Sequence, residues 1–582
     1  MVATLTLMAI GVPWLGAVIV SLVKDDRPRA QHSIAVVFSV LAAIVSLVLI
    51  PQSTKEVVVS LPVGGAFGNF TFVPDGLGAF MTAIACVIGC LAVIFSVDYM
   101  HGEAYLGRYY AWVLFFIGAM SGLVLTSNML VLFVFWEITS LCSYALIAFN
   151  NDDPKAVAGG IKAMVITQLG GIGLLVGALL LYAHTGSYDI KAFLQNPGVL
   201  DPHTLSLMAF GLLIAAAAKS AQFPFQTWLP DAMEAPTPIS ALIHAATMVN
   251  AGVYILNRFY PAFSTVPGWR ETVVVVGLLS ATLAGIMALV ANDLKRALAY
   301  STISQLGYMV YAVGVGGLFA SQFHLLSHAV FKALLFLGAG AVIHAVGTRD
   351  MRQMGNLGKQ MPFVRNVFVI GALALAGLPI LNGFWSKELI LEAGLGSSMI
   401  WAYVIMLLGA GLTALYTFRM VWMVFYGQER SKLHGHDAPL AMRIALIPLA
   451  LGTLTTWLLA GSAGKLLANS ILPFGNEVES LSTVLGKVVL NPATLIALIV
   501  VLLGLGIWYW REQFKGLAQS LHWLGKAAAD SFGFEWINKG IVKTTIDGAE
   551  GLRVTQTGVL NWNLLGIVAG LVIVLAILVM GA

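Results

Sequence analysis

Apolar segments of about 20 residues recur along the whole chain, separated by short polar connections. A helix of that length crosses the hydrocarbon core of a bilayer, and a helix satisfies its own backbone hydrogen bonds in lipid. The pattern therefore predicts an all-α polytopic membrane protein with about 16 transmembrane helices. The predicted spans are residues 3–23, 33–51, 77–98, 110–126, 128–149, 161–183, 203–222, 239–257, 272–291, 297–314, 318–346, 366–395, 399–426, 441–462, 489–510 and 561–581.

Two of the apolar segments are interrupted by proline and glycine beside a lysine. FPFQTWLPDAMEAPTPIS follows Lys219, and AGLPILNGFWSKEL contains Pro379, Gly383 and Lys387. Proline cannot continue a regular helix, and paired breaks in corresponding halves of a chain are typical of transporters built from repeats. Because the predicted breaks lie five spans apart, the two repeats would be inverted. Two unrelated kinks are the alternative.

The C-terminal part of the chain has a different pattern. Residues 511–558 are too polar to span a membrane, and Phe514, Leu517, Leu521 and Leu524 recur at helical spacing. We expect an amphipathic segment along the inner membrane surface or against partner subunits, with a mechanical role or only a structural one. The predicted organisation is 1–106 for the N-terminal helices, 107–260 for a first repeat broken near 219–230, 261–426 for a second repeat broken near 379–388, 427–510 for the C-terminal core helices, 511–560 for the lateral segment and 561–582 for the last helix.

Composition and charge placement refine this topology. The chain is 59% hydrophobic and only 10% charged, whereas soluble domains carry about 25% charged residues. If the N-terminus lies outside, 21 of the 31 lysines and arginines fall in inner loops and 6 in outer loops. Basic residues favour the cytoplasmic side, so we expect both termini outside an inner (cell) membrane of a prokaryote.

The motifs of soluble enzymes give no signal in this sequence. The three cysteines, Cys86, Cys90 and Cys142, fall inside predicted spans and are interpreted as packing residues, because a structural metal site needs four ligands. We find no phosphate-binding loop, dinucleotide fingerprint, haem motif or nucleophile elbow. The sequence therefore predicts no cofactor, metal or catalytic residue in this chain, and the driving force for any transport would come from partner subunits.

Charged residues lie inside the predicted spans. Glu137, Lys219, Lys332 and Lys387 are all in or beside apolar segments. A charge at bilayer depth costs roughly 2.5–3.5 kcal/mol on insertion scales, so such residues mark ion or proton routes. A glutamate and a lysine can switch each other between charged and neutral forms, and Glu137 and Lys219 are candidates. Their pairing cannot be read from spacing, because they lie on different helices.

A second group of titratable residues lies on the span 318–346. His324, His328 and Lys332 are four residues apart and share one face of the predicted helix. Histidine titrates near neutrality, so we favour a proton relay over polar packing for this trio. Packing is the preferred interpretation of His344.

The remaining candidates have strong structural alternatives. His244 is alone on an apolar helix and is by itself more typical of a core histidine. Lys295 begins its span, where interfacial anchoring is as plausible as transport. Lys387 follows the second break and could titrate on the exit side, and Glu388 comes next but need not pair with it. Asp75 is interpreted as a helix cap or loop residue.

Four segments together resemble a known family. FVFWEITSLCSYALIAF, KSAQFPFQTWLPDAMEAPTPISALIHAATMVNAGVYIL, NDLKRALAYSTISQLGYM and GLPILNGFWSKE are similar to the antiporter-like membrane subunits shared by respiratory complex I, group 4 membrane-bound hydrogenases and Mrp sodium/proton antiporters. The resemblance covers nearly the whole chain. GFEWINKG and QTGVLNW in the tail are similar to subunit L of complex I.

The resemblance implies a fold and a set of roles. The fold would be fourteen core helices with two inverted five-helix repeats, plus a C-terminal extension. Glu137 falls on the family's glutamate and Lys219 on its paired lysine. The other matched positions are Lys295, His324 and His328 on the central axis, Lys387 at the second broken helix and His244 in the first half-channel. With Lys332 and Glu388 these complete the predicted proton-transfer residues.

Three departures leave the parent complex open. Asn250 stands where many relatives have lysine, the SKE at 386–388 is closer to Mrp-type and hydrogenase-type members, and the segment 511–558 is short for subunit L. We expect a proton-translocating subunit of a complex with other membrane subunits, and with redox or hydrogenase subunits as candidates. The alternatives are a subunit of an Mrp-type antiporter that exchanges sodium, the membrane partner of a DAB-type inorganic-carbon uptake complex, and a scaffold that conducts nothing.

Overall fold

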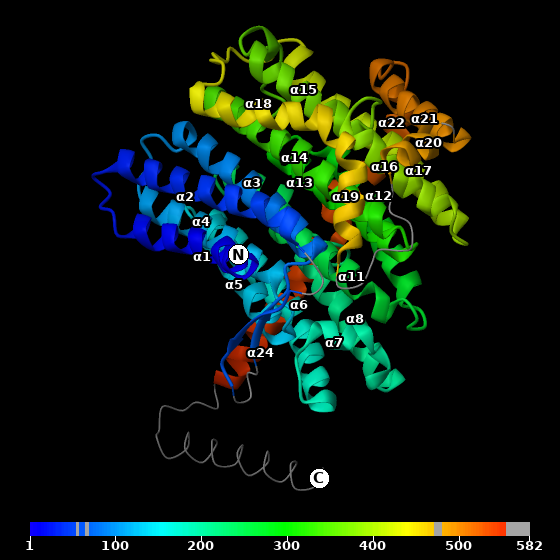
Figure 1. Ribbon diagram of the computed structural model, residues 1–582. Coiled ribbons are helices and arrows are strands. Elements are labelled where there is room, and N and C mark those ends of the chain that lie inside the picture. The colour runs from blue at the N-terminus through cyan, green and yellow to red at the C-terminus, as the bar shows by residue number, and fades with distance from the viewer. Residues whose placement is uncertain (54–56, 65–68, 471–479, 490, 554–582) are drawn as a thin grey trace. The chain divides into compact units, whose positions relative to one another are not determined.

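The computed structural model describes residues 1–53, 57–64, 69–470, 480–489 and 491–553. The chain divides into two compact units, Met1–Gly525 and Lys526–Ala582. The first unit is a bundle of helices (Figure 1), which confirms the predicted all-α polytopic class. In the described part, thirteen helices are long and apolar enough to cross a membrane.

Helices occupy every predicted span that falls within the described residues, and the span at 561–581 lies outside them. Ten helices follow single predicted spans without a break. They are α1 (Val2–Ser21), α2 (Pro28–Leu49), α3 (Gly76–Tyr99), α4 (Leu106–Leu125), α5 (Met129–Ile147), α6 (Pro154–Thr185), α12 (Trp269–Val290), α13 (Leu294–Gly314), α14 (Leu318–Val346) and α21 (Pro492–Tyr509).

Short polar side chains fix where many of these helices begin. Asp75 accepts a hydrogen bond from the Gly78 N–H ahead of α3, and Asn128 accepts two from the first turn of α5. Asp153 and Asp293 cap α6 and α13 in the same way. A helix leaves its first N–H groups without intrahelical partners, so each cap satisfies donors that would otherwise be buried or need water.

The first predicted break is present. α8 (Pro202–Lys219) ends at the lysine itself, and the chain then forms only two short turns, α9 (Trp228–Asp231) and η4 (Ala232–Glu234). The following span is divided into α10 (Thr237–Ala241), a π-helical turn η5 (Leu242–Ala246) and α11 (Met248–Phe263).

The second predicted break is also present. α15 (Pro362–Ala376) ends where Gly377 takes φ +83°, a left-handed conformation that glycine adopts readily. The helix resumes as α16 (Asn382–Leu395). The proposed domain boundaries stay a prediction; the boundary between 260 and 261 falls inside α11, shortly before its end.

The last core spans contain irregular turns. α17 (Ile400–Val421) continues into a π-helical turn η7 (Trp422–Tyr426), and α18 (Leu440–Thr455) continues through η8 (Thr456–Leu459) into α19 (Ala460–Ala468). α20 (Leu481–Val489) precedes α21. Short helical turns in the connections are η1 (Ile50–Gln52), α7 (Ile190–Gln195), η3 (Pro197–Val199) and η6 (Leu357–Lys359).

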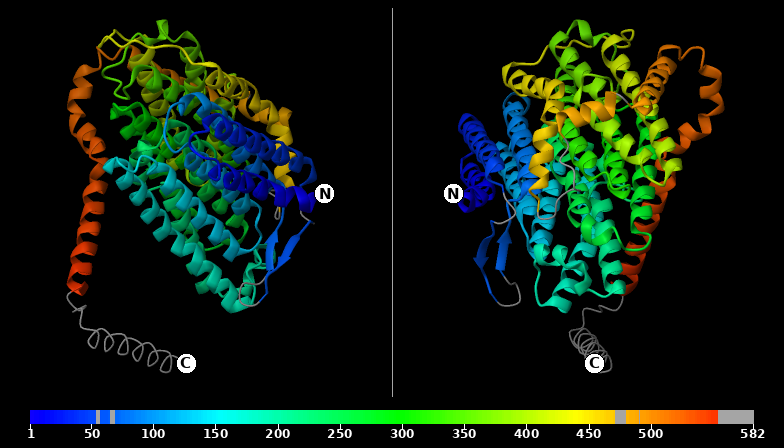
Figure 2. Two further views of the ribbon diagram at one scale, coloured as in Figure 1. Left: turned by 90° about the vertical axis from the view of Figure 1, so that its left-hand side faces the viewer. Right: turned by 45° about the vertical axis from the view of Figure 1, so that its right-hand side comes forward.

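A small hairpin lies at one end of the bundle, beside the connection from α6 to α8 (Figure 2). β1 (Val59–Pro62) and β2 (Asn69–Phe72) are antiparallel, with Val59 opposite Phe72. Main-chain hydrogen bonds join this hairpin to Ser127 and join Ser127 to Ile190. The hydrophobic pattern did not predict this element.

The lateral segment is divided into several helices. α22 (Lys515–Ser520) and α23 (His522–Ala529) follow α21, and the second unit contains η9 (Ser531–Gly533) and α24 (Phe534–Arg553). The helical spacing of Phe514, Leu517, Leu521 and Leu524 therefore runs through two short helices rather than one continuous one.

Candidate functional site

Four lysines are buried inside the first unit, and each ammonium group donates to a main-chain carbonyl oxygen. They are Lys219, Lys295, Lys332 and Lys387, with exposed fractions between 0% and 4%. Among the described residues, none of these four ammonium groups forms an ion pair with a carboxylate. A carbonyl dipole stabilises a cation without supplying a counter-charge, so each lysine can lose its proton without leaving a carboxylate unpaired.

Lys219 is the last residue of α8, and its side chain reaches α5. Its Nζ lies 2.7 Å from the Trp136 carbonyl oxygen and 2.7 Å from the Ser140 hydroxyl oxygen. The same nitrogen lies 4.7 Å from the centroid of the Trp136 ring, at cation–π distance. The ammonium group is therefore anchored to the helix that carries Glu137, one residue before and three residues after it.

Glu137 points to a different helix. Its Oε1 lies against Gly171 on α6, so close that a Cβ at Gly171 would be 2.3 Å away. This oxygen is buried and has no hydrogen-bond partner. Within the described residues, the Lys219 ammonium group bonds to Trp136 and Ser140 and forms no direct ion pair with Glu137. The two groups are thus neighbours, because Lys219 donates to residues on either side of Glu137 in α5.

Lys295 is inside the protein. Its Nζ donates to the carbonyl oxygen of Ala235, which lies in the first helix break. Lys295 is 4% exposed and lies in the first turn of α13, so its ammonium group belongs to the interior. This burial favours a role for Lys295 inside the protein over anchoring at the membrane interface.

A cluster of charged side chains lies near Lys295. The Glu234 carboxylate receives two hydrogen bonds from Arg349, at 2.6 and 2.9 Å, and Arg349 also pairs with Asp293 at 2.6 Å. The hydrogen bonds to Glu234 raise the pKa of the Arg349 guanidinium above its ordinary value. In the same cluster, Asp231 receives hydrogen bonds from Lys162 and Arg296, both at 2.8 Å.

The trio predicted on α14 is buried, and its hydrogen bonds go to α13 and α16. Helix α14 itself lies beside α13 (Figure 1). Lys332 donates to the Leu298 carbonyl oxygen at 3.2 Å and to the Ser301 hydroxyl. His324 and His328 precede Lys332 on the same helix, and their ring centroids are 6.4 Å apart. His328 has no hydrogen-bond partner on either nitrogen among the described residues, and it lies one turn from both Lys332 and His324 on α14.

His324 links α14 to the second broken helix. Its Nδ1 lies 2.9 Å from the Ser386 hydroxyl, and its Nε2 lies 3.2 Å from Gln305 Oε1. Lys387, next to Ser386, donates at 2.9 Å to the carbonyl oxygen of Leu375, in the last turn of α15. The adjacent Glu388 is 8% exposed. The second break therefore places His324 next to the segment that carries the buried Lys387 and Glu388.

His244 lies between the first helix break and the trio of α14. It is in the π-helical turn η5, is fully buried, and has no hydrogen-bond partner on either nitrogen. Lys295 and Lys332 both act on it electrostatically, and its ring lies 5.5 Å from that of Phe336. π-helical turns are frequent at functional sites, so the turn itself is a signal of function that the hydrophobic pattern does not contain.

Sequence reasoning missed one buried ion pair. Arg258 on α11 forms a bidentate pair with Asp75, whose side chain is fully buried at the start of α3. Tyr254 adds a hydrogen bond to the Arg258 side chain. Asp75 is the predicted cap, but its second role depends on a residue 183 positions away. The sequence feature that could have indicated this ion pair is an arginine near the end of an apolar span.

Several buried polar atoms along the row have unused hydrogen-bonding capacity. In the described residues these include atoms of His244, Asn250, Gln305, Gln322, Ser327 and His328. Buried polar groups in proteins bond to protein or to ordered water, so this lining suits water molecules between the titratable groups. Alternating side chains and water are the arrangement that passes a proton over a distance longer than one hydrogen bond.

Comparison with known proteins identifies the family. Residues 126–413 match the model described as NADH:quinone oxidoreductase/Mrp antiporter, transmembrane, and residues 61–110 match NADH-ubiquinone oxidoreductase (complex I), chain 5 N-terminus. The first match contains both helix breaks and all nine predicted proton-transfer residues. The family recognised from the four sequence segments is confirmed.

Three relatives are named as subunits of different complexes. NADH-quinone oxidoreductase subunit L of Pseudomonas aeruginosa is 37% identical, over 88% of this chain and 87% of that protein. NAD(P)H-quinone oxidoreductase chain 5 of Picosynechococcus sp. is 40% identical, over 70% of this chain and 65% of that protein. Na(+)/H(+) antiporter subunit A1 of Staphylococcus aureus is 37% identical, over 75% of this chain and 58% of that protein. The chain thus spans less than two thirds of the second and third relatives.

A solved structure has the same fold. A chain in the structure of the Mrp complex from Dietzia sp. DQ12-45-1b aligns with a TM-score of 0.83 and 29% identity, and the alignment covers 100% of this chain and 63% of that chain. This integral membrane protein therefore belongs to the family of antiporter-like membrane subunits found in NADH:quinone oxidoreductases and Mrp antiporters.

Proposed function

We propose that this chain conducts protons across an energy-transducing membrane as one subunit of a larger complex. The observation that carries the proposal is the buried row of titratable side chains, which runs through both helix breaks. Its buried members are Lys219, His244, Lys295, Lys332, His328, His324, Lys387 and Glu388, and the partly buried Glu137 lies at its start, on the helix that holds the Lys219 ammonium group. Buried ionisable groups in membrane proteins are rare and mark such routes.

The geometry supports a transfer in two halves. In the first, a proton held near Glu137 and Lys219 would move toward Lys295 and His244 as water enters between them. In the second, Lys332, His328 and His324 would pass it toward the second break. Contacts of His324 with Ser386, and of Lys387 with the end of α15, support this order.

The driving force would come from other subunits. The relatives are named as parts of multisubunit complexes, and we propose redox or hydrogenase subunits as partners with no cofactor held by this chain. We further propose a prokaryotic cell membrane with both termini outside. The placement of lysines and arginines supports this orientation.

Replacing Glu137 by Gln tests the proposal. The complex should assemble and keep its redox activity, while proton movement per turnover falls, because the amide cannot take up a proton. Proton uptake by proteoliposomes that contain the complex measures the change. Glu271→Gln, at an exposed carboxylate in the first turn of α12, is the matched control. Unchanged proton movement in the Glu137→Gln variant would contradict the proposal that this chain conducts protons through Glu137.

A sodium/proton exchange function is the second candidate. The Staphylococcus aureus relative named as an Na(+)/H(+) antiporter subunit and the fold match to an Mrp complex favour it. Sodium dependence of proton movement in the same proteoliposomes distinguishes the two. Intact transport after both Lys219→Ala and Lys387→Ala would instead indicate a scaffold that conducts nothing.

A further inference from the structure

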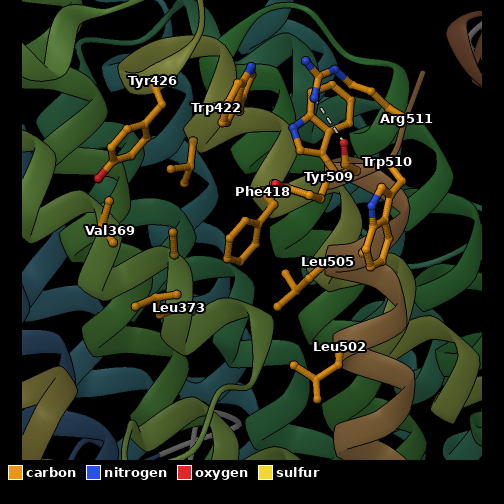
Figure 3. A pocket seen from close by; sticks show the side chains of 14 residues that line it. Val369, Leu373, Phe418, Trp422, Tyr426, Leu502, Leu505, Tyr509, Trp510 and Arg511 are labelled. Atoms are coloured by element: carbon orange, nitrogen blue, oxygen red, sulfur yellow. Dashed lines mark hydrogen bonds between the residues drawn. The ribbon is translucent and has the colours of Figure 1, made fainter. Parts of the chain in front are cut away.

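An apolar cavity of about 620 Å³ lies between three helices, and its lining includes none of the nine proposed proton-transfer residues. It is lined by α15, by α17 with its π-helical turn η7, and by the end of α21 (Figure 3). Val369 and Leu373 form one wall and Leu502 and Leu505 another. The volume is within the range of small-molecule sites, about 300–1,000 Å³.

The two ends of the cavity differ in chemistry. Leu373 and Leu502 lie at one end, and Arg511 lies at the other among aromatic rings (Figure 3). The guanidinium carbon of Arg511 is 5.2 Å from the ring centroids of both Trp422 and Trp508. Tryptophan and tyrosine are enriched at the membrane–water interface and arginine extends toward it, so the chemistry of this end suits the level of the lipid headgroups.

Arg511 is incompletely neutralised by its neighbours. Its Nε lies 4.0 Å from Glu512, whereas the Glu512 carboxylate forms its closer ion pair with Lys515. The guanidinium also donates a 3.3 Å hydrogen bond to the Trp508 carbonyl oxygen, which is neutral like the two tryptophan rings. With two cations and one carboxylate, this rim attracts an anion.

Part of the wall that α21 forms is exposed. Leu502 is 57% exposed and Tyr509 is 73% exposed, and both lie on the outer face of α21. The floor is closed by a buried cluster of Ala376, Ala410, Ala414 and Val501, against which Phe418 and Leu505 pack. The cavity is therefore a blind apolar groove with a cationic rim, open to the surroundings of a membrane protein.

We propose that this groove binds one phospholipid with a negatively charged headgroup. An acyl chain lies along Leu373 and Leu502, and the phosphate is bound by Arg511 between the two tryptophans. The hydrocarbon needs no hydrogen bonds from the walls, and the headgroup supplies the anion that the rim lacks. The inference concerns binding and stands whether or not the chain conducts protons.

The bound chain would also contact the helix end that anchors Lys387. Leu373 lines the groove, and Leu375, one half-turn further along α15, offers its carbonyl oxygen to Lys387. A lipid in the groove therefore supports the last turn of α15 from the side opposite the lysine. This places the lipid in a position to change proton movement at the second break.

Native mass spectrometry of the complex, purified through this chain and then titrated with phosphatidylglycerol or phosphatidylcholine, tests the proposal. We expect the unaltered complex to prefer phosphatidylglycerol. Arg511→Gln should weaken phosphatidylglycerol binding about fivefold, the effect of one basic residue near a membrane surface, and weaken phosphatidylcholine binding less, because the choline group already neutralises that phosphate. Leu373→Trp should weaken both, because it fills the groove.

Arg29→Gln is the matched control, since Arg29 is exposed on α2, which does not line the groove. It should leave binding unchanged; an effect equal to that of Arg511→Gln would overturn the site. Equal affinity of the unaltered complex for the two lipids would also overturn it. A photo-crosslinking residue at position 502 should attach to phospholipid, and its attachment to another protein segment would show that the groove is a subunit interface instead.

Discussion

The Oε1 oxygen of Glu137 lies against the backbone of Gly171, where a Cβ would be only 2.3 Å from it. Gly171 is on α6 and Glu137 is on α5, and the two helices pack along their length. Any side chain at position 171 must displace this carboxylate, because a separation under 3.0 Å is shorter than any ordinary contact. The glycine therefore sets where the proposed proton-accepting group is held.

Gly171→Ala should slow proton movement by about tenfold or more, since displacements of about 1 Å in a reacting group have effects of that order. Because aspartate is one methylene shorter, Gly171→Ala combined with Glu137→Asp should recover part of the loss. Proton uptake in proteoliposomes measures both variants. The carboxyl stretch of protonated Glu137 in infrared difference spectra should shift in the single variant.

Gly11→Ala is the control for this substitution, because a Cβ at Gly11 on α1 meets no atom within 4 Å. It should leave proton movement and thermal stability unchanged. If the double variant were as slow as Gly171→Ala alone, helix packing rather than the position of the carboxylate would explain the effect.

The hydroxyl of Ser140 is the only side-chain oxygen that accepts from Lys219 among the described residues. Ser140→Ala should reduce the stabilisation of the Lys219 ammonium group by about 1.5–3 kcal/mol, the usual contribution of a hydrogen bond to a charged group. We expect a changed rate of proton movement with little change in folding. Ser143→Ala, on the same helix and with no partner for its buried hydroxyl, should have no such effect.

His328 and His344 lie on the same helix but differ in burial. His328→Gln should lower proton movement strongly, because His328 is fully buried between Lys332 and His324. His344→Gln should have little effect, since His344 lies in the last turn of α14 and is partly exposed. Rates measured side by side on assembled complexes decide the point, and equal loss in both variants would contradict the assignment of the relay.

The buried pair of Asp75 and Arg258 should matter for stability. Asp75→Asn leaves the guanidinium without its counter-charge, and breaking a buried pair in this way costs about 3–5 kcal/mol. Thermal unfolding of the purified complex should show the loss, and Asp75→Leu with Arg258→Met should recover most of it. Glu512→Gln, which breaks an exposed pair, should change stability by less than about 1 kcal/mol.

The helix breaks and the buried charges could be predicted from the sequence because their signals are local. Pro379 and Gly383 mark the end of α15 and the start of α16, and Lys219 marks the end of α8. Each depends on a few neighbouring residues and on the cost of placing a charge in lipid. The roles of the nine residues in proton transfer remain a prediction.

The partners of these charges could not be predicted, because packing between distant segments decides them. The direction of Glu137 depends on a glycine 34 positions later in the chain, and Asp75 meets Arg258 from another helix. The bonds from Lys219 and Lys387 go to carbonyl oxygens, which every residue possesses. No side-chain pattern distinguishes the carbonyl that becomes an acceptor from its neighbours.

This use of the backbone has a consequence for genetics. A scan that replaces side chains one at a time leaves the carbonyl oxygens of Trp136, Ala235, Leu298 and Leu375 intact, so the acceptors of all four lysines escape detection. A rigid movement of a helix end, in contrast, changes the acceptor of a lysine without altering any side chain. Amide-to-ester replacement after these residues would weaken each acceptor individually and reveal contacts that conventional mutagenesis cannot address.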